Sequence, residues 1–189
     1  MAVKINHILP FLPLLGASIL AAPASLEDAV RSSRVKGGLV VQIGAADPVL
    51  TASLRVDNRY LVQGLSVDPA TVEKARSVLR AKGLYGAVSV EQFDGRTLPY
   101  LENVVNLIVA EEAAGVSEEE MLRVLVPEGI AWVRRDGAWK KTVKPRPKEI
   151  DDWTHYFHNP SGNAVAKDKV VGPPRRMQWV GSPRWSRHH

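Results

Sequence analysis

The order of elements in residues 39–68 constrains the fold of this chain more than any other feature. An apolar run at 39–43 leads into a turn that contains glycine and proline, and then into a short helical segment at 48–55. A second, largely apolar run at 60–67 ends at the acidic residue Asp68. Continuous apolar runs are typical of strands buried on both faces of a parallel sheet. The segment therefore predicts a strand–helix–strand unit of the kind that binds a ligand at the turn after its first strand.

The alternation of strands and helices continues to residue 143. Apolar periodicity, glycines and prolines place the other elements. The predicted helices cover 26–36, 70–82 and 116–125, and the predicted strands cover 87–92, 104–110, 130–134 and 140–143. Strands that alternate with helices pair mostly in parallel, through right-handed crossovers. The expected fold class is therefore α/β, with a doubly wound and mostly parallel sheet.

The first 24 residues have the pattern of a secretory signal peptide. Lys4 precedes an apolar run at 8–20, and small residues at 22–24 suit cleavage by a signal peptidase. A retained membrane anchor is the alternative, but an apolar core of about a dozen residues falls short of the roughly 20 that span a bilayer. We expect export after cleavage near Ala24 and no stable membrane span. The lack of cysteine excludes disulfides and thiolate metal sites, and does not identify the compartment.

The chain changes character at residue 144. Residues 135–189 carry 12 Lys and Arg against 5 Asp and Glu, a net +7, whereas residues 1–134 carry a net −2. Prolines interrupt the segment 144–189, which also holds the aromatic residues Trp153, Tyr156, Phe157, Trp179 and Trp185. Such a segment cannot build a core alone and is expected to need a partner surface. No nucleic-acid-reading module accompanies the positive charge, so nucleic acid is not the expected partner.

Four motifs within residues 37–135 resemble the class I S-adenosylmethionine-dependent methyltransferase domain. In chain order they are VVQIGAADP, GLSVDPATVEKAR, FDGRTLPYLENVVNLIVAEE and EMLRVLVPEGIAWVR. They are similar to that family's glycine-rich first motif, its second strand with an acidic residue, its adenine-side loop with the fourth strand, and its last helix–turn–strand. The resemblance implies a Rossmann-like methyltransferase sheet at 39–143, between a signal peptide at 1–24, a helix and linker at 25–38, and a basic tail at 144–189.

By this resemblance the cofactor is S-adenosylmethionine, held at the turn after the first strand. Gly44 matches the first glycine of the family motif, whereas Ala46 and Pro48 replace the second and third. Gln42 stands where an acidic residue is usual. The methyl group of Ala46 is expected to crowd the ligand, and alanine adopts a left-handed backbone only at a cost. The motif is therefore eroded, and cofactor binding is expected to be weakened or lost.

Acidic residues complete the implied site. Asp68 would accept hydrogen bonds from the ribose hydroxyls, or it caps the helix that follows, and the two roles are compatible. Asp94 would bind the adenine amino group by resemblance, or it only forms an Asp-Gly turn. Glu111 and Glu112 follow the fourth strand, where acceptors bind, and could act as a base or orient an amine. Their alternative is that of solvated loop residues.

The tail carries a second, narrower resemblance. Residues 149–189 are similar to the segment that precedes a pyrroloquinoline-quinone-type β-propeller in large exported planctomycete-like proteins. This implies a β-propeller domain or partner protein that the present sequence does not contain. His155 and His158 follow Asp151 and Asp152, a spacing that could hold a metal on one helical turn. Further ligands at suitable spacing are lacking, so we expect no metal and favour an aromatic docking helix.

Two functions are compatible with these patterns. The first is a methyltransferase-like domain with an eroded cofactor motif and an unknown acceptor. The alternative is a non-catalytic binding or scaffolding module that docks on a β-propeller. Export argues against turnover, because S-adenosylmethionine is not expected to be supplied outside the cytoplasm. Attachment of the tail to anionic lipid or polysaccharide is a third interpretation.

Overall fold

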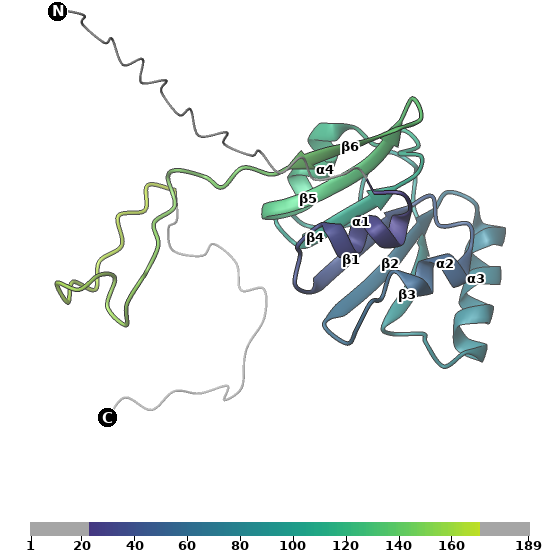
Figure 1. The fold of residues 1–189 in the computed structure, drawn as a ribbon, viewed down its shortest axis with the longest axis horizontal. Coiled ribbons are helices and arrows are strands. Elements are labelled where there is room, and N and C mark those ends of the chain that lie inside the picture. Colours follow the sequence, from purple (N-terminus) through teal and green to yellow (C-terminus); the bar gives the residue numbers. More distant parts are fainter. Residues whose placement is uncertain (1–22, 171–189) are drawn as a thin grey trace, which may run out of the picture. The chain divides into compact units, whose positions relative to one another are not determined.

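The computed structural model describes residues 23–170, and six strands within them form one sheet (Figure 1). The strands are β1 (Gly38–Ile43), β2 (Tyr60–Ser66), β3 (Val88–Gln92), β4 (Val105–Ala110), β5 (Leu125–Arg135) and β6 (Ala138–Val143). Their spatial order is β3-β2-β1-β4-β5-β6. Strands β1 to β5 pair in parallel, and β6 pairs antiparallel with β5. The sheet confirms the predicted α/β, mostly parallel, Rossmann-like fold.

Helices cover both faces of this sheet. They are α1 (Leu26–Ser32), α2 (Pro48–Ser53), α3 (Pro69–Ala81) and α4 (Glu118–Val124). The first three pack on one face, and α4 packs on the other together with the loops after β3 and β4. Figure 1 shows α1 in front of the central strands and α4 behind β5 and β6. The doubly wound arrangement follows, although a loop rather than a helix joins β3 to β4.

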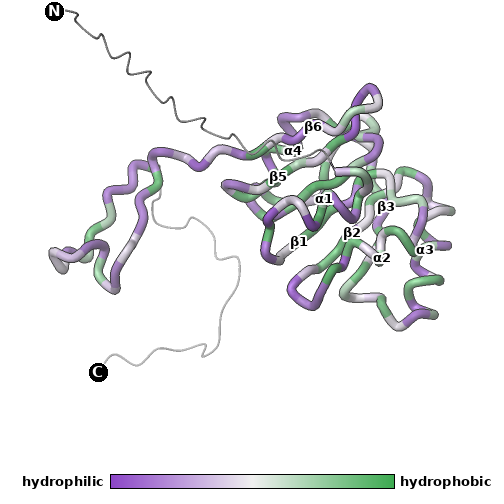
Figure 2. The backbone as a smooth tube through the Cα atoms, viewed as in Figure 1, coloured by the Kyte–Doolittle hydropathy of each residue, from purple (hydrophilic) through white to green (hydrophobic). Residues whose placement is uncertain are grey.

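The sheet separates two hydrophobic cores. On one face Val40 and Leu107 pack with Leu79 of α3. On the other face Ile108 packs with Met121 of α4. Because the central strands are buried on both faces, both sets of alternating side chains are apolar, and the strands form the hydrophobic centre of Figure 2. This explains the continuous apolar runs in the sequence.

The helices begin where the sequence places their caps. Asp47, Asp68 and Ser117 each accept a hydrogen bond from a backbone amide two or three residues ahead, at 2.8–3.2 Å. Such bonds satisfy amide groups that have no partner inside the helix. The proline after each of the two aspartates occupies the first turn of its helix, where its missing N–H costs nothing.

Two element boundaries differ most from those predicted. Helix α1 ends at Ser32 and not at residue 36, because the Ser33 hydroxyl donates to the carbonyl of Val30 (2.7 Å) and Arg34 takes a positive φ of 63°. The predicted turn at 127–129 lies inside β5, which starts at Leu125 directly after α4 and shifts register against β4. Tertiary pairing with neighbouring strands overrides the local Pro and Gly signals in this second case.

The contacts of the chain separate a second unit, which begins at Pro145, from the sheet. Its described residues, 145–170, contain turns and bends but no helix or strand, so the predicted aromatic docking helix is wrong. The reason is local competition for the backbone. The Thr154 amide donates to the carbonyl of His158 (3.1 Å), and Pro160 disfavours a helical backbone at Asn159.

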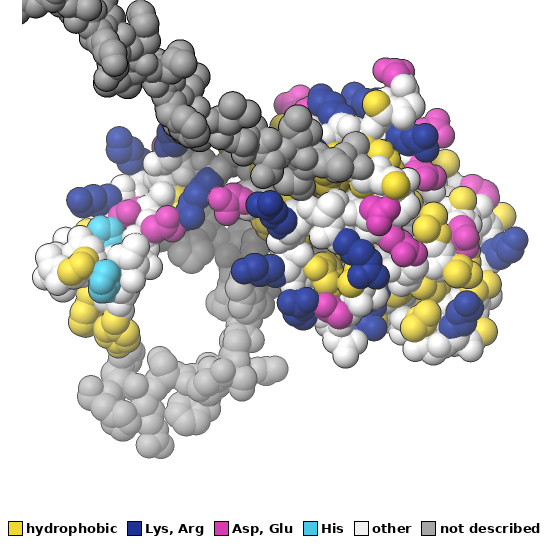
Figure 3. All heavy atoms as spheres, viewed as in Figure 1, with side chains coloured by type: hydrophobic (Ala, Val, Ile, Leu, Met, Phe, Trp, Pro, Cys, Tyr) yellow, Lys and Arg dark blue, Asp and Glu magenta, His cyan; other side chains and the backbone are white. Residues whose placement is uncertain are grey.

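Asp151 closes this segment into a loop. Its carboxylate accepts hydrogen bonds from His158 Nε2 and from the backbone amides of Lys167 (2.7 Å) and Asp152 (2.9 Å). These bonds hold the pKa of Asp151 below its usual value, and the amide of Lys167 contributes most. The Asp151 amide in turn donates to Asp168. We call residues 151–168 the closed loop. Its histidines lie beside hydrophobic side chains, cyan beside yellow in Figure 3.

Two predictions fall mainly on residues outside those described. The signal peptide predicted at 1–24 overlaps the described part of the chain only at residues 23 and 24. The aromatic residues Trp179 and Trp185 of the tail lie beyond residue 170.

Candidate functional site

A cleft of about 510 Å³ opens at the carboxyl edge of the sheet, between the ends of β1 and β4. The strand order reverses here, because β1 lies between β2 and β4. Ligands of open α/β sheets bind at such switch points. The cleft is lined by Leu26, Gln42, Ile43, Gly44, Ala46, Asp47, Leu50, Val67, Glu111, Glu112 and Ala114. The topology alone therefore indicates that this cleft is a candidate ligand site.

Gly44 is the lining residue that presents bare backbone to the cleft. Its φ of +80° lies in the left-handed region that favours glycine, and the amides of Gly44 and Ala45 both donate to the carbonyl of Leu65 at 2.9 Å. A Cβ placed on Gly44 would meet only the Glu112 carbonyl oxygen, at 3.5 Å. The turn therefore brings bare backbone to the edge of the cleft.

Ala46 does not carry the strain that the sequence led us to expect. Ala46 lies exposed in the wall of the cleft, and its φ is not positive. Pro48, at the third motif position, is the first residue of α2, where its fixed φ suits the helix. Among these three motif positions, only Gly44 needs the conformational freedom of glycine. The expectation that Ala46 strains the backbone and so abolishes the site is therefore wrong. The expectation that the Ala46 methyl group crowds a ligand stays a prediction, because this methyl group lies in the wall of the cleft.

Gln42 contributes a buried polar group to the same cleft. Its side chain, on β1, is only 2% exposed, and its Oε1 atom has no hydrogen-bond partner among the described residues. Leaving such an acceptor unpaired costs about 1–3 kcal/mol. A donor on a bound molecule, reached through the cleft that Gln42 lines, would remove this cost.

Two of the predicted site residues, Asp68 and Asp94, lie outside the lining of the cleft. The hydroxyl and amide of Thr71, with the amide of Ala70, hold the pKa of Asp68 below its usual value. The amides of Thr97 and Arg96 do the same for the pKa of Asp94. Both carboxylates are thus engaged by their own loops, as the capping and turn interpretations predict. One oxygen of Asp94, Oδ2, makes no hydrogen bond within the described residues.

The structure brings the other three predicted residues, Gly44, Ala46 and Glu111, together in the cleft. Sequence reasoning missed the contributions of Leu26 from α1 and Leu50 from α2, which supply apolar wall. Leu26 carries only an amphipathic helix pattern in the sequence, and nothing there indicates that α1 reaches the carboxyl edge of β1. The N-terminal helix is therefore a part of the site and not only a linker.

No group of three or more His, Asp or Glu side chains in residues 23–170 is placed to hold a metal ion. The His158–Asp151 contact is a pair without a third ligand. Over the same residues, no helix has both the length and the apolar composition required to cross a bilayer.

No family model matches the chain, and no curated protein matches it. Solved structures, in contrast, match this chain. The [4+2]-cyclase SpnF is 28% identical with a TM-score of 0.50, over 57% of this chain and 43% of that one. A protein from Methanococcus maripaludis named as an S-adenosyl-L-methionine-dependent methyltransferase is 20% identical with a TM-score of 0.50, over 57% of this chain and 52% of that one. The YcgJ protein from Bacillus subtilis is 22% identical with a TM-score of 0.50, over 57% of this chain and 48% of that one.

The chain therefore has a methyltransferase-like Rossmann fold, and it spans about half the length of these neighbours. A cyclase and a methyltransferase by name share this fold with the present chain. Fold similarity at this level leaves the reaction open, because function resides in the site and not in the sheet.

Proposed function

We propose that the cleft between β1 and β4 binds S-adenosylmethionine or its demethylated product, and that the domain is methyltransferase-like in function as well as in fold. The observation that carries the proposal is the pairing of two features in one cleft. Gly44 offers bare backbone in a left-handed turn, and Gln42 offers a buried acceptor without a partner. The fold of the neighbours supports the cofactor class.

The residues present fit such a cofactor in part. Gly44 presents no side chain to the cleft, Gln42 Oε1 would accept a hydrogen bond, and Leu26 with Leu50 would cover apolar atoms. Asp68 and Asp94 do not line the cleft, and their carboxylates already accept hydrogen bonds from their own loops. When bound, the cofactor supplies an electrophilic methyl group. The chain's own contribution is to position ligands and exclude water, which needs no dedicated base.

Isothermal titration of the full chain with S-adenosylhomocysteine and S-adenosylmethionine tests this proposal. We expect micromolar binding that the variant Ala46→Trp abolishes, because the indole would fill the cleft that Ala46 lines. Ala81→Trp is the matched control, since Ala81 is exposed at the far end of α3. No binding heat at millimolar ligand, or equal binding by both variants, contradicts the assignment of the cleft.

One observation favours the alternative, a non-catalytic docking module. The closed loop exposes three aromatic side chains, with Trp153 at 50%, Tyr156 at 89% and Phe157 at 47%. Aromatic side chains held on an ordered loop are suited to a protein interface. A purified pyrroloquinoline-quinone-type β-propeller domain, titrated with the full chain and with Trp153→Ala/Phe157→Ala, tests it. Equal affinity of the two proteins, or no binding, argues against docking through the loop.

We also propose export, on the sequence pattern of residues 1–24. Fractionation of cells that express the full chain, with antibody detection, tests it. Full-length protein in the cytoplasm would count against export and would remove the objection that the cofactor is not supplied where the protein works.

A further inference from the structure

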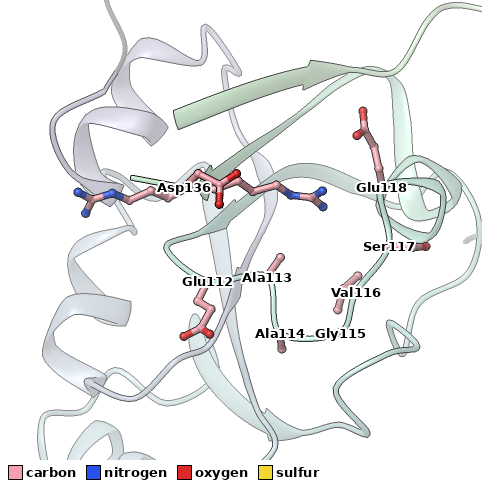
Figure 4. A pocket seen from close by; sticks show the side chains of 10 residues that line it. Glu112, Ala113, Ala114, Gly115, Val116, Ser117, Glu118 and Asp136 are labelled. Atoms are coloured by element: carbon pink, nitrogen blue, oxygen red, sulfur yellow. The ribbon is translucent and has the colours of Figure 1, made fainter. Parts of the chain in front are cut away.

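A second cavity adjoins the cofactor cleft at the same edge of the sheet. Its volume is about 620 Å³, and it lies between the loop 112–118 and the end of β5 (Figure 4). The two cavities share Glu112 and Ala114. In Figure 4, Glu112 and Glu118 lie on opposite sides of this cavity, with Ala113 and Val116 between them. Because β4 and β5 are parallel, both supply their carboxyl ends to this edge.

The backbone of the shared loop is strained. Ala114 has a φ of +50°, a left-handed conformation that costs an L-residue about 1–2 kcal/mol. The strain is held in place by two backbone bonds of 3.0 Å, from Gly115 to the carbonyl of Gly95 and from Val116 to the carbonyl of Ala113. Strained non-glycine residues that the surroundings hold in place are concentrated at binding and active sites. Ala114 lies where the two cavities meet.

Charged side chains of both signs line the second cavity, and they are not equally free. Glu118 already binds Lys140 Nζ (2.6 Å) with one carboxylate oxygen and the Thr142 hydroxyl (3.0 Å) with the other, and the bond from Lys140 contributes most to the lowered pKa of Glu118. The side chains of Glu112 and Arg135, by contrast, make no hydrogen bond or ion pair with any described residue, and the charge of Arg135 acts on Glu118 only as a minor contribution to its lowered pKa. A carboxylate and a guanidinium cation, each without an ion-pair partner, therefore line the same cavity.

Strand alternation distinguishes the two arginines at the end of β5. Successive side chains of a strand point to opposite faces, and Arg135 continues the set of Ala131 and Val133, on the face that α4 covers. Arg134 belongs to the other face, and its Nε donates to the carbonyl of Gly137 (3.4 Å). Arg135 is thus the guanidinium with free donors on the side of Glu118 and the loop 112–118.

We propose that the second cavity is the acceptor site of the function proposed above, on which this inference rests, and that it takes a small zwitterion with a protonated amine and a carboxylate. The amine binds the Glu112 carboxylate, next to the cofactor cleft. The carboxylate binds the guanidinium of Arg135, whose planar fork matches two carboxylate oxygens. No aromatic side chain lines the cavity, which suits a small polar ligand better than a flat ring.

The test titrates the full chain with 4-aminobutanoate, and with butylamine and butanoate as ligands that carry one charge each, with and without saturating S-adenosylhomocysteine. Amide chemical shifts measure the binding. We expect the zwitterion to bind about tenfold tighter than either single-charge ligand, because it adds one charge-assisted contact. Glycine and 6-aminohexanoate, run in parallel, test other separations of the two charges.

Variants locate the two contacts. We expect Arg135→Ala to reduce affinity for the zwitterion to that for butylamine, and Glu112→Gln to reduce it to that for butanoate. Arg59→Ala is the matched control, because Arg59 is an exposed arginine that pairs with Asp57 in the turn before β2, at the opposite edge of the sheet. Urea midpoints of all variants show that the fold is intact.

The outcomes separate this inference from the function on which it rests. Binding of S-adenosylhomocysteine with no preference for any of the three zwitterions overturns the acceptor assignment and leaves the cofactor cleft standing. A zwitterion that binds without any binding of S-adenosylhomocysteine supports the second cavity as a zwitterion site and overturns both the proposed function and the role of that cavity as an acceptor site. Equal loss of affinity in Arg59→Ala and Arg135→Ala refutes the assignment of Arg135, because it shows a general charge effect.

Discussion

The first prediction concerns the close packing of Ala45 against Gly64, which leaves no room for a side chain at residue 64. Gly64 lies in β2, and a Cβ added there would come within 2.6 Å of Ala45 Cβ, 3.1 Å of Thr51 Cγ2 and 3.3 Å of Val90 Cγ2. Ordinary contacts between carbon atoms are about 3.5–4.0 Å. Gly64→Ala therefore overpacks the core beneath the turn that follows β1. We expect a loss of about 1–2 kcal/mol in the free energy of unfolding, since overpacking costs about 1–3 kcal/mol and a strand alanine regains part of it.

A double-mutant cycle makes this reasoning specific. Ala45→Gly alone removes a buried methyl group and adds chain freedom, a cost of about 1.5 kcal/mol. Because Ala45 Cβ is the nearest obstacle, we expect Ala45→Gly/Gly64→Ala to be about as stable as Ala45→Gly alone, a coupling of about 1–2 kcal/mol. Urea unfolding followed by circular dichroism measures all four proteins. Additivity within about 0.5 kcal/mol would refute the direct clash.

Two further predictions concern acidic side chains. Asp68→Ala is expected to lower the urea midpoint because the cap of α3 is lost. Asp68→Asn keeps most of the cap, since its single amide oxygen still accepts from one of the two backbone amides, those of Ala70 and Thr71, that the two carboxylate oxygens now bind. If Asp68 also holds the ribose, Asp68→Asn loses affinity for S-adenosylhomocysteine with little loss of stability. The hydrogen bonds of Arg123 lower the pKa of Glu120 from 4.5. The stability that Glu120 contributes is therefore present above about pH 4.5 and is lost as pH falls through its folded pKa. Glu120→Gln should therefore flatten the acid side of a curve of urea midpoint against pH. An unchanged acid side contradicts this prediction.

Local chemistry made the sheet and its caps predictable. Runs such as that around Val40 are apolar because both faces of the central strands are covered, and Asp68 followed by proline is a local signal for a helix start, which α3 confirms. The loop that joins β3 to β4 agrees with the absence of any predicted helix there, whereas the passage of β5 through Pro127 depends on pairing with distant strands. Local signals do not carry that information.

The candidate site was less predictable than the fold. Gly44, Ala46 and Glu111 were predicted to lie together because they stand at or shortly after the ends of β1 and β4, and the structure places all three in one cleft, since strand ends share one edge of the sheet. The unpaired acceptor of Gln42 was visible only as a departure from a motif, because its burial depends on α1 and α2. The second cavity escaped detection, since Arg135 is one of many charged residues until β5 brings it opposite the loop 112–118.

The loss of motif glycines is a weaker sign of a lost site than it looks in the sequence. A glycine is indispensable only where φ is positive or where a Cβ would collide, and the turn after β1 meets the first condition at Gly44, which is retained. Ala46 sits with an ordinary backbone in the wall of an open cleft, so its methyl group changes the shape of that cleft and not the path of the chain. Altered shape is what a different ligand would require, and a cyclase and a methyltransferase by name already share the fold. The substitutions are thus as consistent with a changed ligand as with decay, and binding measured with several nucleoside ligands, not the motif, decides between them.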